Sequence, residues 1–335
     1  MAFIIDKQAK CAVIGYGSWA TALVKILLEN ESDIIWHIRN PDVADHIMLH
    51  SHNPKYLSSA TFDTDKITIT DDINFAIDNA DIIILAVPSA FLETTLEPLT
   101  LPITNKFIIS AIKGIVPNGF LTIAEYVNQK YDLPFSQIGV ITGPCHAEEV
   151  ALERLSYLNI VTTHPENCEL LASKFRCKYI HINLLSDIYG AEYSAVIKNV
   201  YAISVGIAIG SGYGDNFISV LIANANDEIN RFLEETYPHK RNTSTSAYLG
   251  DLLVTCYSQF SRNRTFGMMV GKGYSVKSAQ IEMAMIAEGY WAASCINQIC
   301  DKKHIDLPIA KAVYAILYER ASAKSVFNKL ASKLL

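Results

Sequence analysis

The sequence lacks any block of like charge, and its formal net charge is only −6 over 335 residues. Proteins that bind nucleic acids concentrate lysine and arginine in one segment or face, so a nucleic-acid partner is not expected. No stretch approaches the roughly 18 uninterrupted apolar residues of a membrane-spanning helix. The first ten residues also lack the long apolar run of a signal peptide. We therefore expect no membrane insertion.

Paired cysteines are also missing. The seven cysteines are odd in number, form no CxxC pair and include several inside apolar segments. This usage is typical of reduced thiols and predicts a cytoplasmic protein. No cysteines and histidines cluster at the short spacing of a zinc site, so no metal is predicted.

What the sequence does contain is apolar residues, which make up 50% of the chain. At this length they favour two domains over one. Short apolar runs predict strands, and most are separated by helical segments. The predicted strands are 10–15, 33–38, 67–70, 81–92, 105–114, 138–143, 159–165 and 179–184.

From Asp187 onward no segment alternates with period two, and only helices are predicted. They are 187–209, 215–236, 247–258, 275–286, 288–300 and 308–333. The fold class is therefore an α/β Rossmann-like N-terminal domain with a parallel-rich sheet, residues 1–186, followed by an all-α domain, residues 187–335.

A glycine-rich turn joins the first strand to the first helix. Gly15, Gly17 and Ala20 fit the pattern G-x-G-x-x-G/A in the strand–turn–helix context of a dinucleotide site. The first glycine permits the tight turn, the second lets a pyrophosphate approach, and the alanine allows close helix packing. An ordinary strand–turn–helix is the alternative.

The end of the second predicted strand bears on the choice of coenzyme. Sites that prefer NAD usually carry an acid there, but this strand ends in HIRNP, and Asp33 lies at its other end. Because an arginine can hold a 2′-phosphate, Arg39 favours or accepts NADP(H) and leaves NAD(H) open. A solvated loop arginine is the alternative reading.

Two lysines occupy positions that suit chemistry. Lys198 lies in the apolar helix 191–210, where an ammonium is costly unless it is paired or used. Lys113 follows a predicted strand at its carboxyl end, where open α/β sheets bind their ligands. The alternatives are a lysine that reaches water from a buried stem and an ordinary surface lysine.

A polar constellation follows in residues 250–267. Asp251 and Thr255 are four residues apart on one helix face. Two arginines, Arg262 and Arg264, are flanked by Ser261 and Asn263 in the sequence SRNR and suit a phosphate group. An exposed charged turn is the alternative.

Taken in order, these motifs resemble the bacterial type of NAD(P)-dependent glycerol-3-phosphate dehydrogenase. The resemblance is carried by GYGSWATAL, RNP, NPKYL, AVPSAFL, SAIKG, GPCHAEEVA, EYSAVIKN with GDN, GDLLVTC with SRNRTFG, and AEG. It implies an active site between a Rossmann-like and a helical domain. It also implies reversible hydride transfer between NAD(P)H and dihydroxyacetone phosphate, which yields sn-glycerol 3-phosphate for phospholipid synthesis. A homodimer is compatible with it.

The resemblance assigns roles residue by residue. It makes Lys198 the catalytic lysine and Lys113 a second one, and we expect Asp251 and Asn199 to hold Lys198 in place. The implied substrate positions are Lys113, Gly143, Cys145, Lys198, Asp251, Ser261, Arg262 and Asn263. The implied cofactor positions, beyond the glycine turn, are Ser18, Trp19, Arg39, Tyr56, Lys113, Ala147, Arg262, Ile286 and Glu288.

One departure and two rival functions remain. Cys145 and His146 stand where the family has a hydroxyl residue and an aromatic, which leaves open whether residue 145 uses its side chain or its backbone. A β-hydroxyacid or 6-phosphogluconate type of dehydrogenase would share the fingerprint but would not need SRNR. A non-catalytic NAD(P)-binding protein would not need both lysines.

Overall fold

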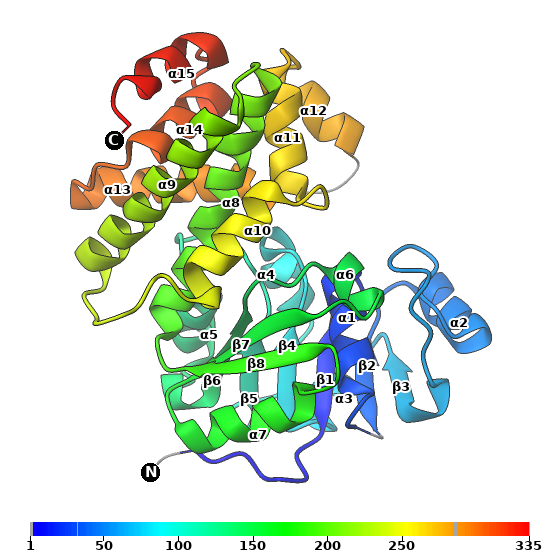
Figure 1. The fold of residues 1–335 in the computed structure, drawn as a ribbon. Coiled ribbons are helices and arrows are strands. Elements are labelled where there is room, and N and C mark those ends of the chain that lie inside the picture. The colour runs from blue at the N-terminus through cyan, green and yellow to red at the C-terminus, as the bar shows by residue number, and fades with distance from the viewer. Residues whose placement is uncertain (1–2, 32, 284–286, 335) are drawn as a thin grey trace. The chain divides into compact units, whose positions relative to one another are not determined.

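The computed structural model describes residues 3–31, 33–283 and 287–334 (Figure 1). The chain divides into two compact units. Unit 1 comprises the residues up to Ile112 together with Leu121–Ile188, and unit 2 comprises Lys113–Phe120 together with the residues from Tyr189 onward. Our single boundary between residues 186 and 187 did not provide for the segment 113–120, which groups with the C-terminal helices.

Unit 1 is built on an eight-stranded sheet in the order β3-β2-β1-β4-β5-β6-β7-β8 (Figure 1). All neighbouring strands are parallel except β6 and β7, which are antiparallel. The predicted parallel-rich sheet is thus confirmed. The strands are β1 (Cys11–Ile14), β2 (Ile34–His37), β3 (Ile67–Thr70), β4 (Ile82–Leu85), β5 (Phe107–Ser110), β6 (Ile138–Thr142), β7 (Ser156–Thr162) and β8 (Ile180–Leu185).

The central strands are buried along their whole length and are almost entirely apolar, because both of their faces are covered; the polar residues His37 and Ser110 are the last in β2 and β5. The helices of unit 1 are α1 (Ser18–Leu27), α2 (Pro41–His50), α3 (Ile73–Asp78), α4 (Leu92–Leu96), α5 (Ile123–Tyr131), α6 (Ala147–Ala151) and α7 (Pro165–Phe175). One predicted strand, 81–92, is too long: β4 ends at Leu85, and a short turn at Ser89–Phe91 leads into α4. Pro88 lacks the N–H that a strand ladder needs.

Unit 2 is helical apart from its connections. Its helices are α8 (Ile188–Gly210), α9 (Asp215–Thr236), α10 (Asp251–Tyr257), α11 (Arg262–Gly271), α12 (Val276–Met283), α13 (Glu288–Lys303), α14 (Pro308–Tyr318) and α15 (Ala323–Ala331). The prediction missed α11. It also drew one helix over 308–333, whereas Arg320 adopts a left-handed φ of 59° and Ser322 caps a new helix, α15.

Helix α8 is long and apolar enough to cross a membrane by length and composition. However, 89% of its most apolar 18-residue window is buried inside the protein. A helix that is apolar on all sides and buried is typical of a protein core. Lys198 and Asn199 lie in the middle of this core helix and are themselves buried.

Helices α8 and α11 touch through their backbones at glycines. A Cβ added to Gly267 would lie 2.1 Å from the carbonyl oxygen of Ile203, and one added to Gly206 would lie 2.1 Å from that of Arg264. Gly210 and Gly271 repeat this close approach one turn further on. Small residues spaced by four let two helix backbones approach closely. The contact fixes α11, and with it the SRNR segment, against α8.

We predict that Gly267→Ala destabilises the protein, because the new methyl group must displace the α8 backbone. Overpacking of this kind costs about 1–3 kcal/mol. The melting temperature, measured by differential scanning fluorimetry, should fall by several degrees. Gly214→Ala is the matched control, because its added Cβ meets no atom within 4 Å. Equal melting temperatures for the two variants would contradict the contact.

Candidate active site

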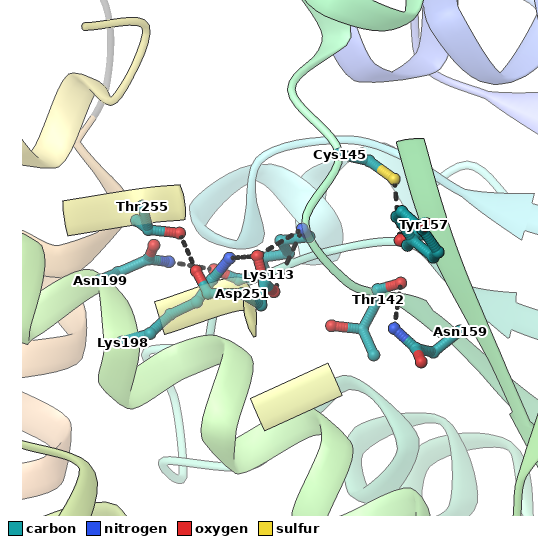
Figure 2. A network of polar contacts seen from close by, with 9 residues as sticks. All are labelled: Lys113, Thr142, Cys145, Tyr157, Asn159, Lys198, Asn199, Asp251 and Thr255. Atoms are coloured by element: carbon teal, nitrogen blue, oxygen red, sulfur yellow. Dashed lines mark hydrogen bonds and ion pairs between the residues drawn. The ribbon is translucent and has the colours of Figure 1, made fainter. Parts of the chain in front are cut away.

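Two lysines share one buried carboxylate in unit 2 (Figure 2). Lys198 on α8 forms an ion pair with Asp251 Oδ1. The Nζ atom of Lys113 lies 3.4 Å from Asp251 Oδ1 and 3.3 Å from Oδ2. The side chains of Lys198 and Asp251 are only 4% and 2% exposed, whereas that of Lys113 is 20% exposed. The structure therefore brings together the two lysines and the aspartate named from the sequence.

This arrangement shifts the pKa values of Lys198 and Asp251. Burial lowers the pKa of Lys198 to about 7, with a smaller lowering from Lys113 and an opposing attraction from Asp251. Burial alone would raise the pKa of Asp251, but the charges of Lys113 and Lys198 hold it below its usual value. Two cations around one anion leave one positive charge in excess. The more deeply buried lysine, Lys198, can give up its proton near neutral pH.

Local structure places Asp251 with precision. A π-helical turn, Ser246–Gly250, precedes α10 and ends directly before Asp251. The Thr255 hydroxyl donates to the Asp251 carbonyl at 2.6 Å, which confirms that these two residues share one helix face. Single π-turns next to α-helices are frequent at functional sites.

Asn199, next to Lys198 on α8, forms a hydrogen bond to the backbone of the second lysine. Its amide Nδ2 donates to the backbone carbonyl of Lys113 at 2.8 Å (Figure 2). This hydrogen bond ties the Lys113 backbone to α8, and the expectation that Asn199 holds Lys198 stays a prediction. Neighbouring positions on a helix point in different directions, so Lys198 and Asn199 reach different partners.

The SRNR segment forms the start of α11. Ser261 is the N-cap, and its Oγ accepts from the N–H of Arg264 at 3.3 Å. Asn263 Oδ1 accepts from the N–H of Gly289 at 2.9 Å. These acceptors are thus engaged in holding the helix ends, while Arg262, half-buried, is the first helical residue. A helix N-terminus that carries an arginine suits an anion.

The glycine turn in unit 1 fits a dinucleotide. Gly15 has a φ of +118°, and a Cβ there would lie 2.5 Å from the Ala86 carbonyl oxygen. Gly17 is the N-cap of α1, and the space where its Cβ would be is open to 4 Å. Ser18 begins the helix, and Ala20 is buried against the core. An open glycine at a helix N-terminus lets a pyrophosphate approach the first N–H groups.

Asn53 is a residue that the sequence reasoning missed. It is fully buried, and its Nδ2 donates to the Tyr16 carbonyl at 3.0 Å and to Thr21 Oγ1 at 2.9 Å. Its Oδ1 accepts from the N–H groups of Lys55 and Tyr56 at 3.0 and 3.2 Å. Asn53 therefore ties the NPKYL loop to the glycine turn. The Asn-Pro pair indicated a turn, but nothing local could reveal partners more than 30 residues away.

The other predicted cofactor positions are spread over several elements, and only some of them are close in sequence to the glycine turn. Trp19 lies in the first turn of α1, and the half-buried Tyr56 has its ring 6.4 Å from that of Tyr16. Arg39 is exposed just beyond β2, where the N–H of Gly15 donates to the His37 carbonyl at 3.2 Å. Ala147 and Glu288 begin α6 and α13, and Ile286 is outside the described residues. Their roles remain predictions.

The loop after β6 contains the predicted substrate positions Gly143 and Cys145, and the contacts described for them are with residues of unit 1. A Cβ on Gly143 would lie 2.4 Å from Asn159 Nδ2, so only glycine fits there. The Cys145 thiol donates to the Tyr157 carbonyl at 3.1 Å, and its N–H donates to the Gly143 carbonyl at 2.8 Å (Figure 2). The thiol therefore braces the loop against β7. Substrate contacts of Gly143 and Cys145 remain predictions.

Comparison with known proteins finds family models and relatives that match nearly the whole chain. Residues 10–168 match the family model of the NAD-dependent glycerol-3-phosphate dehydrogenase N-terminus, and residues 187–328 match that of its C-terminus. The chain is 31% identical over 315 residues to glycerol-3-phosphate dehydrogenase [NAD(P)+] of Staphylococcus carnosus, covering 93% of this chain and 95% of that one. The corresponding protein of Staphylococcus aureus strain JH9 is 32% identical over 325 residues, covering 96% of this chain and 98% of that one.

A solved structure agrees with the sequence matches. The crystal structure of glycerol-3-phosphate dehydrogenase from Coxiella burnetii superimposes with a TM-score of 0.89 at 25% identity. It covers 97% of this chain and 99% of that chain. The glycine turn, the two lysines on one carboxylate and the full-length matches together lead to one conclusion: this chain belongs to the NAD-dependent glycerol-3-phosphate dehydrogenase family.

Proposed function

We propose that Lys198 transfers the proton in the reaction of this family, the NAD(P)H-dependent reduction of dihydroxyacetone phosphate to sn-glycerol 3-phosphate. The observation that carries the proposal is the buried Lys113–Asp251–Lys198 cluster. When bound, NAD(P)H supplies the hydride. The remaining chemistry, which is charge stabilisation and proton transfer at the carbonyl oxygen, is within reach of the lysines.

The charge balance of the cluster supports this role. In reduction, the carbonyl oxygen becomes negative as its carbon gains a hydride, and an ammonium beside it stabilises that charge. Lys198 then gives its proton to the oxygen and becomes neutral. The remaining Lys113 ammonium and Asp251 carboxylate balance each other. In the reverse direction neutral Lys198 takes the proton of the hydroxyl group.

We assign the substrate phosphate to the start of α11. Arg262 supplies a cation with donors that match phosphate oxygens, and the positive end of the helix dipole adds to its attraction. Ser261 and Asn263 hold this end of the helix in place through the hydrogen bonds that they accept from Arg264 and Gly289. Binding energy from the phosphate can then orient the distant carbonyl for reaction.

We infer that the product supplies glycerophospholipid synthesis and that the enzyme works in the cytoplasm. All seven cysteines lie among the described residues and none forms a disulfide; six of them are buried, which suits a reducing compartment. A homodimer remains a prediction from the resemblance.

Lys198→Ala should lower kcat by about 10²–10⁴-fold, because general acid–base catalysis contributes that much. NADPH binding, measured by fluorescence titration, should stay close to wild type, because the glycine turn lies in unit 1. Lys174→Ala is the matched control, since Lys174 is another buried lysine paired with a carboxylate, Glu31, at 3.0 Å. Near-normal turnover of the Lys198 variant in a folded protein would remove Lys198 from the mechanism.

The pH dependence should have opposite signs in the two directions. With a pKa of about 7, Lys198 is increasingly neutral above that pH. The kcat/KM for glycerol 3-phosphate oxidation should therefore rise through pH 7, whereas that for reduction should fall. In Lys198→Arg the guanidinium stays protonated, so the inflection near pH 7 should disappear. An inflection that persists in this variant would belong to another group, such as the substrate phosphate.

Arg39→Ala should weaken the use of NADPH and affect NADH little. A charge-assisted bond to the 2′-phosphate is worth about 1.5–3 kcal/mol, so the KM for NADPH should rise about tenfold or more. Initial rates with each coenzyme measure this ratio. Arg176→Ala, which also changes an exposed arginine of unit 1, should leave the ratio unchanged. Equal losses with NADPH and NADH in the Arg39 variant would show that Arg39 does not read the 2′-phosphate.

A further inference from the structure

Three histidines gather at the end of α2, in the sequence HIMLHSH, a short spacing that our search of the sequence for metal ligands missed. His46 and His50 are four residues apart, which places them on one face of the helix. At Ser51 the chain adopts a left-handed φ of 59°, and this turn brings His52 back toward His46. The ring centroids of His46 and His50 lie 4.4 Å apart, and those of His46 and His52 lie 4.8 Å apart.

The spacing of two ring nitrogens matches that of two metal ligands. His46 Nε2 lies 3.2 Å from His52 Nε2. Zinc binds imidazole nitrogen at about 2.0–2.1 Å with tetrahedral angles, which places two such nitrogens about 3.3 Å apart. One ion can therefore replace the shared proton of the histidine pair with little movement of either ring.

The hydrogen bonding of His52 presents its Nε2 as an electron-pair donor. His52 Nδ1 lies 2.9 Å from the His50 carbonyl oxygen, which can only accept, so Nδ1 carries the proton. Its Nε2 then holds a lone pair directed at His46. Histidines that bind metals usually donate their other ring N–H to such a carbonyl, which fixes the tautomer and the orientation of the ring.

The backbone around His52 is held on both sides. His52 forms a β-bridge with Thr61, and the N–H of Phe62 donates to the Ser51 carbonyl at 2.8 Å. On the other side, Asn53 is anchored to Tyr16 and Thr21 of the glycine turn. Because the ligand backbone is already ordered, binding an ion would cost little conformational entropy.

We propose that His46 and His52 form a surface site for a divalent transition-metal ion of the zinc, nickel and copper class. Imidazole ligands suit these ions, and water would complete the coordination sphere. His50 offers a third imidazole on the same helix face after rotation of its side chain. Within the described part of the chain no three His, Cys, Asp or Glu side chains are already arranged around an ion. The site is therefore a preformed pair.

The test is isothermal titration calorimetry of the whole chain with zinc chloride in a non-chelating buffer. Wild type should bind one equivalent of zinc, and its melting temperature should rise on binding to the extent that the ion prefers the folded arrangement to the unfolded chain. His46→Gln and His52→Gln should each weaken zinc binding by roughly tenfold or more, since a lost ligand costs at least as much as a lost second-shell partner.

His239→Gln is the matched control, because it removes an exposed histidine that belongs to unit 2, whereas α2 belongs to unit 1. It should bind zinc as wild type does. Two results would overturn the proposal: no zinc binding by the wild-type protein, or unchanged affinity in the His46 and His52 variants. Neither histidine belongs to the Lys113–Asp251–Lys198 cluster, so basal turnover without zinc should be unaffected in both variants.

Discussion

The buried carboxylate of Asp251 is the group on which the lysine cluster depends. Two ammonium groups brought out of water repel each other and lose hydration, so neither would be stable there alone. Asp251 offsets both costs, because one of its oxygens pairs with Lys198 and both lie within 3.4 Å of Lys113. The compensation is incomplete: burial, with a smaller contribution from the charge of Lys113, still lowers the pKa of Lys198 to about 7.

Backbone contacts keep Lys198 and the start of α11, the proposed phosphate site, at a fixed spacing. The glycines of α8 and α11 touch without intervening side chains, and a Cβ on Gly289 of α13 would lie 2.5 Å from the Asn199 carbonyl oxygen. Asn263 then binds the N–H of Gly289. If flexible side chains separated these helices, the distances between the helix axes could vary. Contacts between backbones fix Lys198, Asn199 and Arg262 within a single rigid group of helices.

Much of this could be predicted from the sequence, because periodicity reports local structure. The buried strands and α8 follow from their apolar residues. Helix α11 was missed because Gly267 and Gly271 are poor helix formers, and their value lies in a contact with α8 that no local pattern reveals. The partners of Asn53 and Asn199 were unpredictable for the same reason: each hydrogen bond joins residues far apart in the chain.

The assignment of Lys113 to unit 2 explains how the chemistry is organised. Lys113 follows β5 closely in sequence, yet its side chain binds Asp251 and its carbonyl binds Asn199. The segment 113–120 thereby completes the lysine cluster within the helical unit, while the glycine turn, Asn53 and Arg39 belong to unit 1. The electrostatic environment of Lys198 is thus set by groups of its own unit.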